Sequence, residues 1–539
     1  MAGVKFENGY RGVGWLKKQW PWWTAGLLTA IAEIINYLFI PWGHPKHKFI
    51  GVTSGFARMY AHFESTLFGK SLIATKPDYQ PALQWIIIGA FIGALVLVWL
   101  EGEWRSWVKY PKKMLVFTAL GAFFFAWGTR VAGGCTLHHL LGGVPAFNLK
   151  SFVVMGFATL GALIAFKILT IHNIAQYFKS QDTKWYVKQA AEYKMADGLT
   201  YNEGPSHGWL RNALYAYLVL FFLVALYGAL AGNDYAVKMG WAESIENTYI
   251  YSNMLTVGKN LPTILLQIIV GVLLGVSVAK TGFGTECGLI NPEMANMIAK
   301  DEIAFAKKWK MPYSLRTVML SLQPFAALAL HAFIFGLVLW IGFTFFGIME
   351  GHHWATEEFA KIYAQATGIE FHKTGVAIRE MTSLPMDIFG GLLLGLGTVF
   401  MLGCEFRNYG RTGLLYITGL LIWIFFYIGY LPYTLARDFW DGLMGGYPYS
   451  STTFVPALIA PTSKTAQSII YLLYILMWLA LFIWAVRTGA RNIGVTPKEI
   501  LWMNSEDMYL KRLEKLEKEG KLDEIIAIER ELYEQAEKA

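Results

Sequence analysis

One glycine-rich stretch decides the fold of this chain: Arg130-Val-Ala-Gly-Gly-Cys135-Thr-Leu-His138-His139-Leu-Leu-Gly142-Gly143. It lies between two hydrophobic runs that are each long enough to enter a membrane, and it contains one of the three cysteines of the chain. In hydrocarbon, irregular backbone is tolerated only where it is buried in protein or lines a cavity. The stretch therefore predicts a helix that is interrupted inside a membrane, at a place that water or a substrate reaches.

Two later stretches share this design and hold the other two cysteines. They are Lys280-Thr-Gly282-Phe-Gly284-Thr-Glu286-Cys287-Gly288 and Met401-Leu-Gly403-Cys404-Glu405-Phe-Arg407-Asn408-Tyr-Gly410-Arg411. A fourth break begins at Gly51 and has Thr53 and Ser54 in place of a cysteine; we interpret residues 51 to about 67 as a re-entrant half helix. A single buried cysteine is most often a small hydrophobe, but three cysteines in three glycine-rich breaks favour a functional role.

The composition excludes an ordinary soluble protein. The chain has 539 residues, of which 55% are hydrophobic and 16% are charged, and its mean hydropathy is +0.39. Its apolar runs reach the length that a hydrocarbon core requires, so we predict an all-α, polytopic helical membrane protein. The net charge of +8 would suggest nucleic acid in a soluble chain. Here the lysines and arginines gather in particular loops, which indicates membrane orientation and no nucleic-acid partner.

About ten transmembrane spans are predicted, together with re-entrant half helices. The spans are about 22–40, 83–101, 113–129, 150–170, 208–232, 260–280, within 317–348, 384–402, 411–431 and 467–487. Basic residues before the first span and in the loop after residue 300 place both termini in the cytoplasm by the positive-inside rule. We expect the first span to remain as an anchor in a bacterial or archaeal inner membrane.

The breaks divide the chain into two similar halves. The predicted parts are a cytoplasmic N-terminal segment (1–21), a first membrane half (22–170), a cytoplasmic linker (171–207), a connecting span (208–232), a second half (260–431), an extra span (467–487) and a charged, helical cytoplasmic tail (488–539). The single crossing of 208–232 inverts the second half, so we predict an hourglass-like, inverted-topology repeat. For the tail, a solvated helical extension is favoured over contact with a partner or another protomer.

The chemistry of the breaks suits a small anion. The free N–H groups and the positive dipole end at the start of a half helix attract negative charge. A neutral thiol adds a weak donor that touches a sulfur-containing anion without holding it tightly. The predicted relay residues are Cys135, Cys287 and Cys404, and the predicted path residues are Gly133, Gly134, Thr136, His138, Thr53, Ser54, Gly284, Glu286, Gly403, Glu405, Arg130, Arg407 and Arg411.

Several alternatives stay open at this stage. A thiol at a helix N-terminus can become a reactive thiolate, which would favour covalent sulfur chemistry. His138 and His139 follow Cys135, but one turn does not supply the further ligands of a closed metal site, so no metal and no cofactor are expected. Glu405 either pairs with Arg407 or Arg411, gates the path, or lies in an exposed loop. The three arginines are expected to add positive potential at the mouths of the constriction.

At these residues the sequence resembles the YeeE/YedE family of sulfur-compound transporters. The run from Arg130 to His138 is similar to the family's R-x-A-G-G-C-T-x-G-H run, and Gly391 to Cys404 is similar to its second glycine-cysteine pattern; Lys280 to Pro292 is a looser match. The resemblance covers roughly 20–435 and implies an hourglass-shaped inner-membrane protein that takes up thiosulfate, with the cysteines as relay thiols. Thr53, Ser54 and His139 depart from the family pattern.

Two classes of function follow from these observations. The first is a permease, without enzyme activity, for thiosulfate or a related small sulfur anion, or a selenium-related transporter of the same family. The second is a membrane subunit of a sulfur redox enzyme, and a structural scaffold is a third. Because no cysteine follows Cys404, we expect no fused sulfur-carrier domain, which leaves a separate cytoplasmic sulfur-carrier protein as a partner.

Overall fold

The computed structural model describes residues 19–41, 47–101, 112–174, 208–249, 261–349, 353–373 and 381–537. Most of the basic N-terminal segment, the basic loop after the second predicted span and most of the predicted linker lie outside the described residues. The described chain is almost entirely helical. Its strands are β1 (Trp354–Ala355) and β2 (His372–Lys373), which pair in parallel over two residues each.

Long apolar helices form the body of the molecule. Within the described residues, eight helices are long and apolar enough to cross a membrane, and the shorter apolar helices α1 and α3 accompany them. The ten helices at the predicted spans are α1 (Trp23–Leu38), α3 (Trp85–Glu101), α4 (Lys112–Val131), α5 (Leu149–Ile171), α7 (Gly208–Ala231), α10 (Leu261–Thr281), α14 (Gln323–Phe346), α16 (Leu384–Phe400), α18 (Ile417–Leu435) and α21 (Lys464–Ile493). The prediction of a polytopic helical membrane protein is confirmed.

Four shorter helices begin at the four predicted breaks. They are α2 (Val52–Phe68), the π-helical turn η4 (Leu137–Gly143), α11 (Thr285–Lys300) and α17 (Glu405–Gly413). Three of the breaks contain a glycine with positive φ after the preceding helix: Gly133 at 78°, Gly282 at 69° and Gly403 at 145°, the last of them following Leu402 at 63°. Such backbone is costly for residues with a Cβ, so these glycines explain why the apolar runs do not continue as single helices.

One predicted boundary is wrong. The span expected at 411–431 begins at Ile417, and Arg411 belongs to the half helix α17. The separation occurs at Leu415, whose φ of 64° interrupts the helix. The apolar run from Leu414 continues without any glycine or proline at this point, so hydropathy alone could not locate the turn.

The contacts between the two halves come in equivalent pairs. Helix α1 of the first half packs on α14 of the second as α10 of the second packs on α3 of the first, and α5 packs on α16 as α18 packs on α4. Contacts between α1 and α10 and between α4 and α16 also join the two halves. These approaches are close because small residues line them: a Cβ on Gly271 would lie 2.1 Å from the Ile86 carbonyl oxygen, and one on Gly395 would lie 1.9 Å from that of Ala158. The pairing is the one expected of two structural repeats; their inverted orientation in a membrane stays a prediction.

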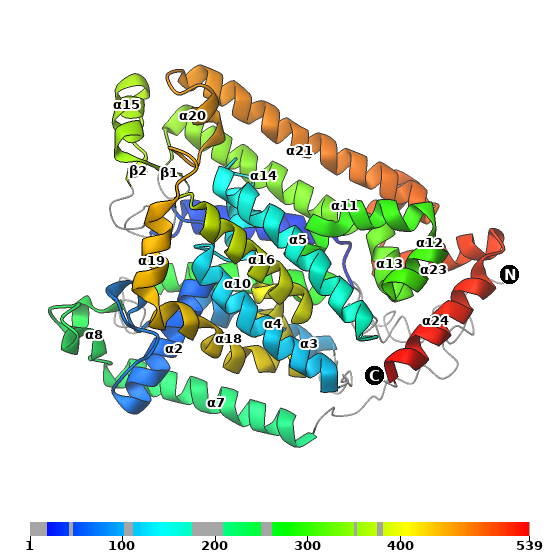
Figure 1. The fold of residues 1–539 in the computed structure, drawn as a ribbon, viewed down its shortest axis with the longest axis horizontal. Coiled ribbons are helices and arrows are strands. Elements are labelled where there is room, and N and C mark those ends of the chain that lie inside the picture. The colour runs from blue at the N-terminus through cyan, green and yellow to red at the C-terminus, as the bar shows by residue number, and fades with distance from the viewer. Residues whose placement is uncertain are drawn as a thin grey trace.

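The remaining elements gather at two opposite ends of the molecule (Figure 1). At one end, here called the α19 end, lie α8 (Tyr235–Lys238), α15 (Glu357–Thr367) and α19 (Arg437–Gly446). At the other, here called the tail end, lie α12 (Glu302–Trp309), α13 (Tyr313–Leu320), α23 (Ser505–Lys518) and α24 (Leu522–Glu537). The other short elements are η2 (Pro77–Tyr79), η6 (Ile245–Asn247), α20 (Val455–Ile459) and α22 (Pro497–Trp502).

The tail does not form a solvated extension, so that expectation is wrong. Its helices α23 and α24 pack on α13 and α12, and the side chains of Met508, Leu513 and Ile525 are buried. The start of the described residues lies at the same end, because the indole of Trp22 donates a 2.7 Å hydrogen bond to Ser505. The two ends of the described chain therefore share one side of the molecule, and the cytoplasmic location of the termini stays a prediction.

Candidate functional site

The four half helices meet at their N-termini. The Thr53 hydroxyl, in the first turn of α2, donates a 2.9 Å hydrogen bond to Glu405, the first residue of α17. The Thr285 hydroxyl, the first residue of α11, donates a 3.1 Å hydrogen bond to Thr136, which precedes η4. These contacts join residues 352 and 149 positions apart, so they bring both halves of the chain to one place.

Side chains do not cap these N-termini. Within the part of the chain that the structure describes, the residues before α2, η4, α11 and α17 accept no capping hydrogen bond through their side chains. The first N–H groups of a helix lack intrahelical partners, and the aligned peptide dipoles add partial positive charge there. Several such termini facing one another in a buried region favour an anion.

The three cysteines lie at these same termini, and all three are buried free thiols. Cys135 precedes η4, and its thiol interacts with the side chains of both Thr53 and Glu405. Cys287 is in the first turn of α11, where Arg407 approaches its sulfur at 3.8 Å. Cys404 directly precedes α17. The predicted association of the cysteines with the helix starts is therefore present in the structure.

Glu405 is the most central of the predicted charged residues. It is 1% exposed, and it accepts hydrogen bonds from the Thr53 hydroxyl at 2.9 Å and from the Tyr409 hydroxyl at 2.5 Å. Within the described residues no ion pair within 4 Å joins it to an arginine, so the expected pairing with Arg407 or Arg411 is wrong. Exposure in a loop is excluded by its burial.

Arg130 approaches this group from α4. Its guanidinium donates a 2.9 Å hydrogen bond to the Tyr79 hydroxyl and a 3.3 Å bond to Ser54, and it lies over the ring of Tyr430. Arg130 also acts electrostatically on Glu405. It is only 3% exposed, so the positive charge that the sequence predicted at a mouth of the path is buried beside the central carboxyl group.

Arg407 and Arg411 are also buried, at 3% and 2% exposure, so they do not lie at open mouths. Arg411 donates to the backbone carbonyl of Leu402 and thereby holds the third break in place. Arg407 contacts Cys287, while its Nε is buried without a hydrogen-bond partner. Gly403 makes room for this side chain, since a Cβ there would lie 2.5 Å from Arg407 Cδ.

The two histidines of the first motif contact neighbouring aromatic and hydroxyl side chains. His138 is partly buried and meets the rings of Phe49 and His139 edge-on. His139 is paired with the Ser151 hydroxyl at 3.1 Å, on α5. No group of three residues able to hold a metal ion occurs among the described residues. Gly134 lies against both rings, because a Cβ there would be 2.6 Å from His138.

Other predicted residues have simpler positions. Gly284 is the residue before α11, and Gly133 supplies the positive φ that ends α4. The side chain of Glu286 lies outside the part of the structure that is described. Sequence reasoning missed Tyr79, Tyr409 and Tyr430. Tyr409 follows Glu405 by four residues, which is the spacing of neighbours on one helix face, whereas Tyr79 and Tyr430 reach Arg130 only through tertiary packing.

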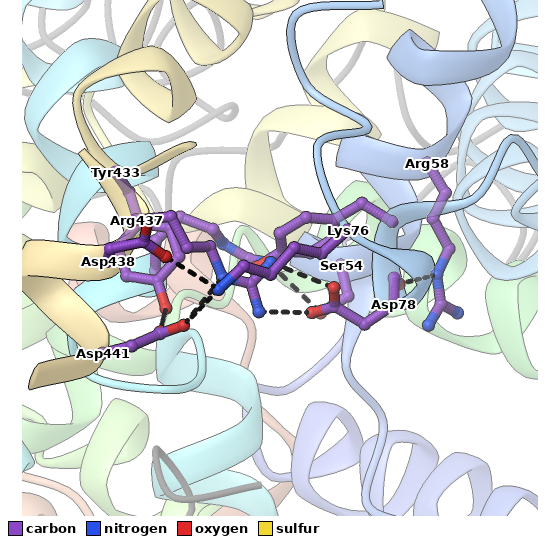
Figure 2. A network of polar contacts seen from close by, with 10 residues as sticks. Ser54, Arg58, Lys76, Asp78, Tyr433, Arg437, Asp438 and Asp441 are labelled. Atoms are coloured by element: carbon purple, nitrogen blue, oxygen red, sulfur yellow. Dashed lines mark hydrogen bonds and ion pairs between the residues drawn. The ribbon is translucent and has the colours of Figure 1, made fainter. Parts of the chain in front are cut away.

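A polar cluster that includes Lys76, Asp78, Arg437, Asp438 and Asp441 lies at the α19 end (Figure 2). Arg437 binds Asp78 through two hydrogen bonds of 3.0 and 3.1 Å, and Lys76 forms ion pairs with Asp438 and Asp441. The ring of Tyr79 has the guanidinium of Arg437 at 5.2 Å and that of Arg130 at 5.5 Å. One aromatic ring thus contacts both the surface cluster and the buried site.

Comparisons with known proteins concern the first half of the chain. Residues 7–164 match the family model described as sulphur transport, which confirms the resemblance for that region. The thiosulfate transporter TsuA of Spirochaeta thermophila is 25% identical over 142 residues, which cover 26% of this chain and 39% of that protein. The match to that relative thus spans well under half of its length.

Proposed function

We propose that this chain, whose first membrane half matches the sulphur transport family, is a membrane transporter that takes up thiosulfate or a related small sulfur-containing anion. One observation carries the proposal: uncapped starts of interrupted helices from both halves meet in a buried place, and each of the three cysteines lies at one of them. The name of the TsuA relative adds thiosulfate as the first substrate to test.

The donors at this place suit a weakly held anion. Backbone N–H groups at helix starts and the nearby guanidinium groups of Arg130 and Arg407 supply positive potential. Thiols are weak donors and polarizable, so they contact a sulfur anion without trapping it. Conduction requires such a balance, because a site that binds too tightly does not release its ion.

The cysteines lie at the starts of half helices from both halves, which suggests that they pass the anion from one thiol to the next. Cys135 belongs to the break before η4, whereas Cys287 and Cys404 belong to breaks in the second half. An anion that enters from the α19 end would meet the group around Arg130 and Cys135 and would then pass to Cys287 and Cys404. We take the tail end to be cytoplasmic, in line with the basic loop after residue 300. A cytoplasmic sulfur-carrier protein would receive the transported sulfur anion there.

Uptake of labelled thiosulfate tests the proposal. Cells that lack their own uptake route would carry the parent chain or one of Cys135→Ala, Cys287→Ala and Cys404→Ala. Each variant is expected to lose roughly tenfold or more of the uptake rate, the loss expected when about 1.4 kcal/mol of interaction disappears from a rate-limiting passage. Cys135→Ser should retain part of the rate, because its hydroxyl still donates a hydrogen bond.

Ser277→Ala is a matched control for these variants. Ser277 is buried in α10, its hydroxyl has no hydrogen-bond partner in the structure, and it lies outside the site. Its replacement should leave both membrane expression and uptake at the parent level. Uptake by all three cysteine variants at the parent rate would refute the relay, and absence of uptake by the well-expressed parent would refute the thiosulfate transporter.

A further inference from the structure

We propose that the carboxyl group of Glu405 occupies the anion position as an internal competitor, and that it takes up one proton whenever a substrate anion replaces it. Uptake would then be coupled to proton movement. The inference rests on the proposed function and deepens it, since it adds a second transported ion to the same site. The observation behind it is that one acidic side chain, Glu405, lies among groups that otherwise favour a negatively charged ligand.

Glu405 uses the donors that a substrate oxyanion would need. Its two carboxyl oxygens accept from Thr53 on α2 and Tyr409 on α17, and the Cys135 thiol interacts with the same group. These donors come from three separate segments of the chain. A buried carboxylate that accepts several hydrogen bonds imitates a bound anion, so Glu405 and a substrate anion would compete for the same donors.

The charged groups around Glu405 can be named element by element. Arg130 reaches it from α4 and Tyr430 from α18, while Cys135 and Tyr409 contact it directly. Of the other helices that pack on α17, α10 contributes Lys280, and α2 carries Arg58, His62 and Glu64. Arg407 and Arg411 lie on α17 itself, where Arg407 contacts the Cys287 sulfur and Arg411 donates to the Leu402 carbonyl.

These surroundings have two opposing effects on the ionisation of the Glu405 carboxyl group. Burial disfavours its charged form, whereas the three donors and Arg130 favour it. A substrate anion brought close to a carboxylate would be repelled, and at about 4 Å the repulsion would weaken binding on the order of a hundredfold or more. Protonation removes this repulsion. By linkage, the factor by which a proton strengthens anion binding equals the factor by which the anion strengthens proton binding.

The cycle balances in charge and protons. One proton from the aqueous side at which the anion arrives binds to a Glu405 carboxylate oxygen, and the neutral acid turns away from the donors that the anion takes. When the anion leaves on the other side, the proton dissociates there and the carboxylate returns to Thr53 and Tyr409. One proton and one anion therefore move together, and no bond other than the O–H bond forms or breaks.

The test uses the purified full-length protein in liposomes, with labelled thiosulfate as the probe. Uptake is measured at an external pH of about 5.5 and about 7.5, a range above the usual glutamate pKa of about 4.3, with the membrane potential clamped. The parent should take up thiosulfate faster at the lower pH, by up to about tenfold per pH unit for one proton. Glu405→Gln should transport at a rate that changes less than about twofold over this range.

Two further glutamates serve as comparisons. Glu64 is 5% exposed in α2 and accepts hydrogen bonds from Ser71 and Tyr427, away from the site, so Glu64→Gln should keep the parent's pH dependence. Glu33 is buried in α1 and one of its carboxyl oxygens has no hydrogen-bond partner. Loss of the pH dependence in Glu33→Gln, with its retention in Glu405→Gln, would overturn the proposal.

The remaining outcomes are also decisive. A parent that takes up thiosulfate equally at both pH values overturns proton coupling and leaves the proposed function intact, whereas a parent without uptake overturns both. If gel filtration shows that Glu405→Gln does not fold, Tyr409→Phe replaces it, because it keeps the ring contact with Phe56 and removes one donor to the carboxylate. Its uptake curve should move to higher pH, and an unchanged curve overturns the proposal.

Discussion

Two ionic clusters hold opposite ends of this molecule, and they differ most in exposure to solvent. The α19 cluster, at the α19 end, consists of Lys76, Asp78, Arg437, Asp438 and Asp441 (Figure 2). The tail cluster consists of Glu302, Arg316, Arg512 and Glu529. Side-chain exposure in the α19 cluster reaches 97%, whereas in the tail cluster it does not exceed 10%.

We interpret the buried tail cluster as a permanent connection between helices and the exposed α19 cluster as one whose ion pairs can open and re-form. A buried charge that loses its partner is strongly destabilising, while an exposed pair exchanges its partner for water at little cost. Arg316 forms ion pairs with Glu302 of α12 and with Glu529 of α24, so it holds the tail helix α24 against α12 and α13. Arg437 instead contacts Tyr79, whose ring and hydroxyl also meet Arg130 of the site. The exposed cluster is thus the one connected to the proposed anion path.

The largest effect is expected from breaking the tail cluster. Arg316→Met would leave Glu302 and Glu529 without their common partner, at a cost of about 3–5 kcal/mol. The melting temperature in detergent should fall, and limited proteolysis should remove α23 and α24 at a protease concentration that leaves the parent intact. Lys307→Met is the control, because its pair with Glu524 is 3.8 Å long and more than half exposed. Equal stability of the two variants would contradict the comparison.

A smaller effect is expected at the α19 cluster. Arg437→Gln loses the two hydrogen bonds to Asp78 and the contact with the Tyr79 ring, which together are worth about 1–2 kcal/mol for a partly buried arginine. Removing this positive charge should raise the KM for thiosulfate while kcat changes little, and the difference should shrink at high salt. Asp438→Asn alters the most exposed member and should leave KM unchanged. A fall in kcat alone would contradict the assignment of Arg437 to anion attraction.

The sequence predicted the helices of the site more fully than the contacts between them. Glycines located all four breaks and cysteines marked three of them, because loss of apolar periodicity and, in three breaks, left-handed glycine backbone are local properties. The bond from Thr53 to Glu405 joins residues 352 positions apart and depends on the packing of two halves. The tail shows the same limit: its charged sequence favoured a solvated extension, whereas the packing of α23 on α13 and of α24 on α12 is set by tertiary structure.

The smallest effect is expected from pH between about 5.5 and 7.5 on the two clusters. Burial alone would raise the pKa of Glu302, but the charges of Arg316 and Arg512 outweigh it, so its pKa is lowered from 4.5. Stability from a lowered carboxyl pKa is present above the unfolded value and is lost only as pH falls through the folded value. The hydrogen bond to Asp441 raises the pKa of Lys76 above 10.5, so that contribution is lost only as pH rises through the raised value.

Neither Glu302 nor Lys76 therefore titrates in the range used to test proton coupling. The melting temperature and the protection of the tail against protease should stay constant between about pH 5.5 and 7.5, because Glu302 keeps its charge there. A fall in tail protection at the lower pH would contradict this and would make the tail an alternative origin of pH-dependent uptake. With both clusters constant, a response of uptake to pH that disappears in Glu405→Gln must arise inside the path, where the half helices meet.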